Sequence, residues 1–159
     1  MKLKDYMVGD WIATEHDFPM QVTAVGKDYL YADFDGNEGD VFEFDEKNPP
    51  KPIPLTEEIL KTNDFRYGLS TDQEDLLACG IGEPCETHNL WVWENENGGV
   101  VSINFPTESD GGQLYCHNDH KNECIDMSYS WLETIYVHQF QHILRICGLD
   151  ELADNLKIK

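Results

Sequence analysis

The sequence predicts an α+β protein in which an SH3-like small β-barrel is followed by an antiparallel sheet covered by a C-terminal amphipathic helix. Three observations support this class. The first 55 residues read as short alternating strands joined by turns rich in Gly and Asp. The proline-rich stretch NPPKPIP (48–54) cannot form a central strand. A strongly amphipathic helical pattern lies near the C-terminus. We therefore expect a barrel-like module over 1–54 and an α+β part over 55–159, which can form one continuous domain.

The barrel is predicted from four short segments with strand character. Apolar and polar side chains alternate in them, as expected for half-buried strands. The expected strands lie at residues 10–14, 20–26, 28–34 and 40–44. Four or five strands in so little chain are typical of a small, strongly bent barrel.

The α+β part is predicted from two helical patterns and a hairpin. A short helix is expected over 56–63, because Thr56 is a good N-cap and two glutamates occupy the first turn. Strands are expected over about 90–117, with a turn at residues 97–99. Trp91 and Trp93 share one strand face, which favours a core position beneath the final helix.

The final helix is expected over residues 134–147 and ends at Gly148, which is typical of a C′ glycine. His138 and His142 are four residues apart, the spacing that zinc hydrolases use. The pattern nevertheless argues against catalytic zinc, since Gln139 stands where the general base is required and cannot take a proton. Helical periodicity places both histidines and Arg145 opposite the apolar stripe. We expect this side to face solvent, and these three residues are the candidate partner-binding residues.

A second candidate site is a group of cysteines and histidines in CETH (85–88) and CHNDHKNEC (116–124). Structural zinc requires four nitrogen or sulfur ligands, usually as two close pairs. Cys85 and His88, together with two residues from a second group, would supply these four ligands. The second group contains Cys116, His120 and Cys124. The alternative is ordinary buried thiols and loop histidines. No other cofactor motif and no catalytic motif is present, so the chain is not expected to be an enzyme.

The composition restricts the partners that the protein can have. The formal net charge is −20, with 31 acidic and 11 basic residues. A chain without a basic segment is poorly suited to bind phosphates, which argues against direct contact with nucleic acid or an anionic membrane. No apolar run is long enough to span a bilayer, and no signal-peptide pattern is visible. Five cysteines, an odd number, argue against a secreted disulfide framework. We expect a cytoplasmic protein.

Three blocks carry a resemblance to a known family: YMVGDWI (6–12), PIPLTEEILKTNDF (52–65) and YVHQFQHILRICGL (136–149). They resemble a family of short proteins, with no assigned activity, from gut anaerobic bacteria and their prophages and mobile elements. The resemblance implies a bacterial, intracellular context and transfers no site residue.

Three functional hypotheses remain open at this point. The leading one is a non-enzymatic accessory module of a phage or mobile element that binds a protein partner. The second is a zinc-stabilised or metal-dependent protein that uses the Cys/His group. The third is an acidic DNA mimic, for which the net charge of −20 is the support.

Overall fold

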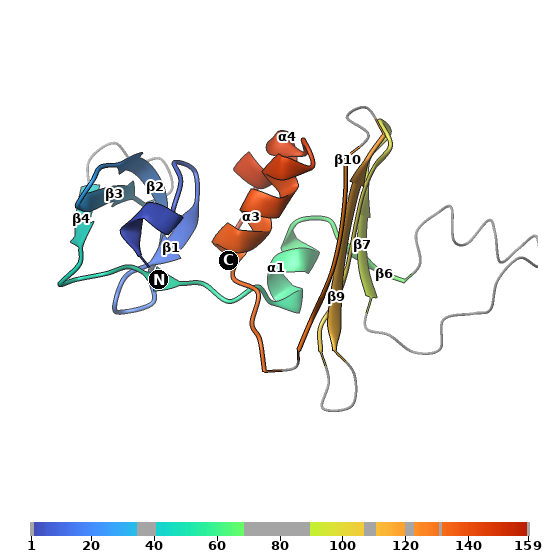
Figure 1. Ribbon diagram of the computed structural model, residues 1–159, viewed down its shortest axis with the longest axis horizontal. Helices are drawn as coiled ribbons and strands as arrows, with labels where there is room; N and C mark the ends of the chain where they lie inside the picture. The colour runs from blue at the N-terminus through green and yellow to red at the C-terminus, as the bar shows by residue number, and fades with distance from the viewer. Residues whose placement is uncertain are drawn as a thin grey trace, which may run out of the picture.

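The computed structural model describes residues 2–34, 41–68, 90–106, 111–119, 123–130 and 132–158. It is an α+β protein whose N-terminal sheet and second sheet lie on opposite sides of a group of helices (Figure 1). The helices are α1 (Glu57–Thr62), α3 (Val137–Ile146) and α4 (Asp150–Asp154), with a short 3₁₀ turn at Leu3–Asp5.

The N-terminal sheet is a curled antiparallel half-barrel with the strand order β4-β3-β2-β1-β5. Its strands are β1 (Trp11–Ala13), β2 (Pro19–Val25), β3 (Tyr29–Asp33), β4 (Val41–Asp45) and β5 (Lys51–Pro52). The four predicted strands are confirmed. The proline-rich stretch contributes only the two-residue strand β5, which pairs with β1 at one edge of the sheet. An edge is where a sheet tolerates proline.

The core of the half-barrel lies on its concave face. The register pairs Leu30 with Phe44 and Ala32 with Phe42, so these four side chains point to the same face. The register between β2 and β3 shifts between Val22 and Ala24. Such an irregularity bends a strand and increases its twist, which suits a curled sheet.

The second sheet is antiparallel with the order β10-β9-β8-β7-β6. Its strands are β6 (Arg66–Tyr67), β7 (Leu90–Glu94), β8 (Gly99–Asn104), β9 (Gly112–Asn118) and β10 (Glu123–Tyr129). The predicted hairpin is confirmed, and Gly98 adopts φ +77° in its turn. Strands β6 and β10 were missed by the sequence analysis, which counted Cys124 of β10 among the candidate zinc ligands.

One face of the second sheet packs against the helices and forms the larger core. Trp91 and Trp93 lie on this face, as predicted; Trp91 is buried and Trp93 is partly buried against the same cluster. From the other side, α3 contributes Phe140 and Leu144, both with no exposed surface. The apolar stripe predicted for the final helix therefore covers the sheet.

The N-terminus of α1 lies where the sequence predicts it, whereas that of α3 does not. The Thr56 hydroxyl accepts a hydrogen bond from the Ile59 amide at 3.3 Å, which confirms the predicted N-cap of α1. Helix α3 begins at Val137, three residues later than predicted, because the preceding segment pairs with the linker. The Leu55 amide donates to Ile135 O, and the Val137 amide donates to Ile53 O.

Gly148 ends α3 in the left-handed conformation, with φ +73°. The Leu149 amide donates to Leu144 O at 2.8 Å, and the Gly148 amide donates to Arg145 O at 2.9 Å. This pair of bonds is the Schellman arrangement. It satisfies carbonyls at the end of α3 and directs the chain into α4.

Replacing Gly148 by alanine is expected to lower the free energy of unfolding by about 1–2 kcal/mol, since a Cβ atom is disfavoured in this conformation. Urea unfolding followed by circular dichroism measures the loss. The matched control is Gly148→Asn, because asparagine tolerates positive φ better than other residues with a side chain. An equal loss for both variants would argue against a conformational origin.

Candidate functional site

The polar side of α3 is buried against the half-barrel, so the prediction that it faces solvent is wrong. His138 is only 2% exposed, and the side chains of His142 and Arg145 are 25% and 14% exposed. Helical periodicity separates the polar from the apolar side, but it cannot show that a second unit of the same chain covers the polar side. The three candidate partner-binding residues thus contact the protein's own N-terminal part.

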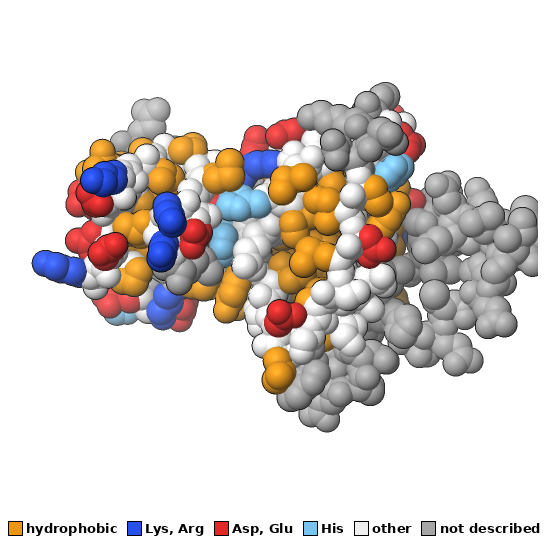
Figure 2. All heavy atoms as spheres, in the orientation of Figure 1, with side chains coloured by type: hydrophobic (Ala, Val, Ile, Leu, Met, Phe, Trp, Pro, Cys, Tyr) orange, Lys and Arg blue, Asp and Glu red, His pale blue; other side chains and the backbone are white. Residues whose placement is uncertain are grey.

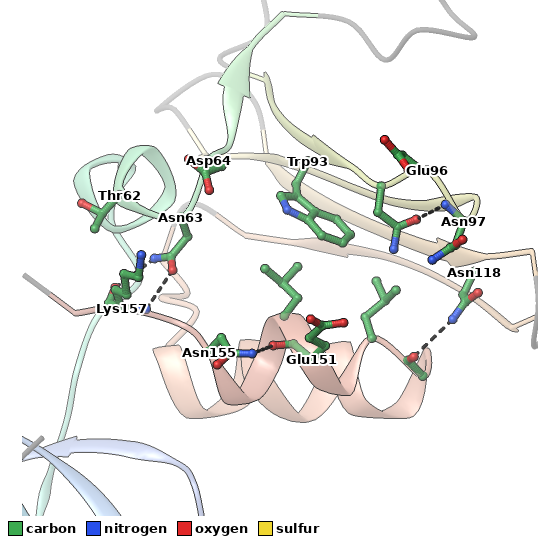
Figure 3. Close-up of a pocket in the computed structure, with 14 residues that line it drawn as sticks. Thr62, Asn63, Asp64, Trp93, Glu96, Asn97, Asn118, Glu151, Asn155 and Lys157 are labelled. Atoms are coloured by element: carbon green, nitrogen blue, oxygen red, sulfur yellow. Dashed lines mark hydrogen bonds between the residues drawn. The ribbon is translucent and has the colours of Figure 1, made fainter. Parts of the chain in front are cut away.

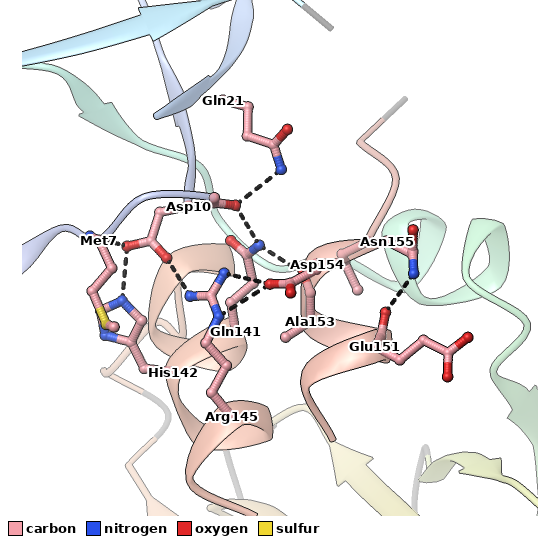
Figure 4. Close-up of polar contacts among 12 residues, drawn as sticks. Met7, Asp10, Gln21, Gln141, His142, Arg145, Glu151, Ala153, Asp154 and Asn155 are labelled. Carbon is pink, nitrogen blue, oxygen red and sulfur yellow. Dashed lines mark hydrogen bonds and ion pairs between the residues drawn. The ribbon is translucent and has the colours of Figure 1, made fainter. Parts of the chain in front are cut away.

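Asp10 is the centre of this contact and has no exposed surface. Its Oδ1 accepts a hydrogen bond from Arg145 Nη1 at 2.8 Å, and its Oδ2 lies 2.7 Å from His142 Nε2. Oδ2 also accepts from the Met7 amide at 2.8 Å. Arg145 in turn pairs with Asp154 of α4 at 3.1 Å (Figure 4). A buried carboxylate is tolerated only with such compensation.

Gln141 extends the contact with three hydrogen bonds of 2.9 Å each. It accepts from the Trp11 amide and donates to Gly9 O and Ala153 O. The Trp11 indole donates to Leu156 O at 2.7 Å. These bonds connect β1 with α3, α4 and the chain that follows. We call the side chains of Asp10, Trp11, Gln141, His142, Arg145 and Asp154 the joint.

His138 and Tyr6 lie beside the joint, with ring centroids 4.8 Å apart. Burial lowers the pKa of His138 to about 4 and raises the pKa of Tyr6 to about 12, so both side chains are neutral near pH 7. Neither His138 Nδ1 nor the Tyr6 hydroxyl has a hydrogen-bond partner within the described part of the chain.

The joint consists of hydrogen bonds and ion pairs between the half-barrel and the helices. Where the chain is described, His142 is hydrogen-bonded to the Asp10 carboxylate, its ring lies edge-on to that of His138, and no hydroxyl or thiol forms a hydrogen bond with it. A carboxylate–histidine pair acts in covalent catalysis only when it activates such a group. Figure 2 shows histidine surface at the boundary between the half-barrel and the rest of the molecule.

The two described cysteines of the Cys/His group do not converge. Cys116 is buried in the core, whereas Cys124 is exposed. The β9–β10 register places Cys116 opposite Ile125 and Cys124 opposite His117. Opposed residues share a face and neighbours alternate, so the two thiols point to opposite faces of the sheet. They cannot bind the same ion.

The remaining members of that group, Cys85, His88 and His120, lie outside the described residues. Within the described ranges, no three metal-binding side chains come together. Burial raises the pKa of the Cys116 thiol, which disfavours the thiolate form that binds metals.

Two surface features were missed by the sequence analysis. The first is an aromatic cluster on the half-barrel, which we call the aromatic rim and define as Phe18, Phe34 and Phe42. The ring centroids of Phe34 and Phe42 are 5.5 Å apart, and those of Phe18 and Phe34 are 6.5 Å apart. Phe18 is 57% exposed and Phe42 45% exposed. Phe42 lies on the concave face, opposite Ala32 at the end of the core.

The second missed feature is a cavity of about 700 Å³ between the end of α1, the β7–β8 turn and α4 (Figure 3). Five of its fourteen lining residues are asparagines, and Trp93 lies among them. The asparagines are scattered between residues 63 and 155, so no local sequence motif could have located the cavity.

Comparison of the chain with protein-family models, curated proteins and solved structures gave no match. No helix in the described ranges has the length and apolar character needed to cross a membrane.

Proposed function

We propose that the protein is a non-enzymatic protein-binding module, an accessory protein of a phage or mobile element, and that the aromatic rim is its contact surface. The observation that carries the proposal is the exposure of Phe18 and Phe42 around Phe34. Large aromatic side chains are enriched where proteins meet their partners, because they bury much apolar area with little loss of conformational freedom.

The distribution of apolar surface supports this choice. Ten large hydrophobic side chains are exposed among the described residues, and seven of them lie between Met7 and Phe42. The exposed apolar surface is thus concentrated on the half-barrel. Tyr29 and Val41 point away from the face that carries Phe42, so only part of this surface belongs to the rim. Single exposed hydrophobic residues are normal, whereas a concentration of them is typical of an interaction surface.

The joint connects the half-barrel, which carries the aromatic rim, to the helices. Asp10, Trp11 and Gln141 hold the half-barrel that carries the rim to α3 and to the segment after α4. A preorganised surface loses less conformational entropy when a partner binds. We also propose that the half-barrel is an SH3-like module, which is supported by its five short antiparallel strands and strong curl.

The charge of the chain restricts the partner. A net charge of −20 repels acidic proteins and favours association with basic ones. The preferred partner is therefore a protein with a basic surface around an apolar patch, and its association should weaken as salt increases.

The proposal is tested by comparing variants of the full chain as immobilised baits for a lysate of a gut anaerobic bacterium. The test variant replaces Phe18 and Phe42 by serine. The matched control is Tyr29→Ser, because Tyr29 is 44% exposed on the same half-barrel and points to the other face of β3. Thermal unfolding confirms that all three proteins are folded.

A partner should be captured by the wild-type protein and by Tyr29→Ser. The double variant should lose affinity for it by more than about tenfold, which corresponds to 1.4 kcal/mol. A partner that all three proteins retain equally would show that the rim is not the contact surface.

A further inference from the structure

The cavity between α1, the β7–β8 turn and α4 has a lining unlike the rest of this acidic protein. Five of the seven asparagines in the described residues line it, and only Asn48 and Asn104 lie elsewhere. We propose that this cavity binds a neutral, polyhydroxylated ligand, which is the chemistry of a carbohydrate. This site is separate from the aromatic rim and goes beyond the proposed protein-binding function.

The size of the cavity suits a small ligand. Its volume of about 700 Å³ lies within the range of about 300–1,000 Å³ that is typical of ligand pockets. Its walls come from three elements that are distant in sequence, and α1, α4 and the two strands that flank the turn all contribute side chains to the larger core. The walls are therefore set by the fold rather than by one loop.

The backbone fixes the asparagines that form the walls. Asn63 donates to Ile59 O at 2.7 Å and to Lys157 O at 2.9 Å, and its Oδ1 accepts from the Lys157 amide at 2.8 Å. Asn95 Oδ1 accepts from the Gly99 amide at 2.7 Å. Asn155 Nδ2 donates to Glu151 O at 2.8 Å. Each of these three side-chain amides is thus held in place by one or more bonds.

Several of these amides keep hydrogen-bonding capacity for a ligand. Within the described residues, Asn95 Nδ2, the side-chain amide of Asn97 and Asn155 Oδ1 make no hydrogen bond. The cavity therefore offers both donors and acceptors. A hydroxyl group donates one hydrogen bond and accepts others, so a ligand with many hydroxyls uses both kinds of group.

Trp93 supplies the apolar surface that such a ligand also needs. Figure 3 shows its indole projecting from β7 toward α4, between the turn that carries Asn97 and the helix that carries Glu151. Leu149 and Leu152 line the cavity as well. A sugar ring has an apolar C–H face and a polar hydroxyl rim, which matches an indole surrounded by amides.

The charges of the lining oppose an anionic ligand. Asp64, Glu96 and Glu151 contribute three carboxylates, whereas Lys157 is the one basic residue of the lining. A phosphate or nucleotide would be repelled. A cation is the competing ligand, but all three carboxylates are exposed to solvent, which weakens their attraction for it.

The test is a titration of ¹⁵N-labelled full-length protein, followed by heteronuclear NMR. The neutral probes are cellobiose, lactose and chitobiose, each added separately, and spermidine is the cationic probe at the same ionic strength. The readouts are the Trp93 indole N–H and the side-chain amides of Asn95, Asn97 and Asn155. The proposal predicts saturable shifts of these signals with at least one disaccharide and a dissociation constant in the millimolar range or below.

Trp93→Phe should weaken this binding more than about tenfold, which corresponds to 1.4 kcal/mol. Trp91→Phe should leave this binding unchanged. It makes the same chemical change on the same strand, but Trp91 does not line the cavity. If Trp93→Phe does not fold, Asn97→Ala replaces it, since Asn97 is exposed in a turn. Saturable binding of spermidine alone, or no saturable shift with any probe, would overturn the proposal.

Discussion

Replacing Asp10 by alanine is expected to destabilise the protein by about 3–5 kcal/mol, because it leaves the Arg145 guanidinium partly buried without its closest carboxylate. It also removes the acceptor for His142 and for the Met7 amide. Urea unfolding near pH 7, monitored by tryptophan fluorescence, measures the change in the free energy of unfolding.

Asp154→Ala is the matched control for this loss. Asp154 pairs with the same arginine, but its side chain is 63% exposed, so its removal should cost less than about 1 kcal/mol. A double variant with Asp10→Ala and Arg145→Met should be more stable than Asp10→Ala alone, because the unpaired cation is then gone. An equal cost for Asp10→Ala and Asp154→Ala would refute the central role of Asp10.

The stability of the protein is expected to fall by about 3 kcal/mol between about pH 6.5 and pH 4 through His138 alone. Burial lowers the pKa of His138 to about 4, from an ordinary value of 6.5. Within this range the unfolded chain binds a proton that the folded protein does not, so acid favours the unfolded state. Above the ordinary value both states are neutral, and the contribution of His138 no longer changes with pH.

The variant His138→Phe should remove this component, because phenylalanine packs against Tyr6 and does not titrate. Urea unfolding at intervals between about pH 7.5 and pH 4 gives the slope of stability against pH for each protein. The control is His16→Gln, since the side chain of His16 is 75% exposed. A variant without His138 that keeps the wild-type slope would contradict the assignment.

Local patterns predicted most of the secondary structure. The alternation in β2 and β3, the Thr56 N-cap and the Gly148 C-terminus each depend on neighbouring residues, and each is confirmed. Strand β10 was missed although Ile125, Met127 and Tyr129 alternate with polar residues. Cys124 had been grouped with Cys116 and His120 as a possible zinc ligand, and the alternation of apolar and polar residues after it was not recognised.

The candidate site was harder to predict because its parts are distant in sequence. His142 and Arg145 were recognised as one polar face, but their partner Asp10 lies more than 130 residues away. One Asp among 31 acidic residues carries no signal by itself. The joint and the asparagine-lined cavity are products of tertiary packing, which periodicity cannot reveal.

The aromatic rim shows that alternation along a strand predicts which face a side chain lies on, but not whether it is buried. The alternation in β4 places Phe42 and Phe44 on the same face, and the register confirms this. Phe44 is buried, whereas Phe42 is 45% exposed. The difference arises because Phe42 lies toward the end of the core, and a pattern along one strand does not show where the core ends.

The joint places the half-barrel on α3 and thereby sets the position of the aromatic rim. The decisive measurement is a nuclear Overhauser spectrum of the full chain near pH 7. The indole N–H of Trp11, which donates to Leu156 O at 2.7 Å, should show cross-peaks to protons of Leu156. A well-dispersed spectrum without any cross-peak between residues 2–52 and residues 137–156 would contradict the account.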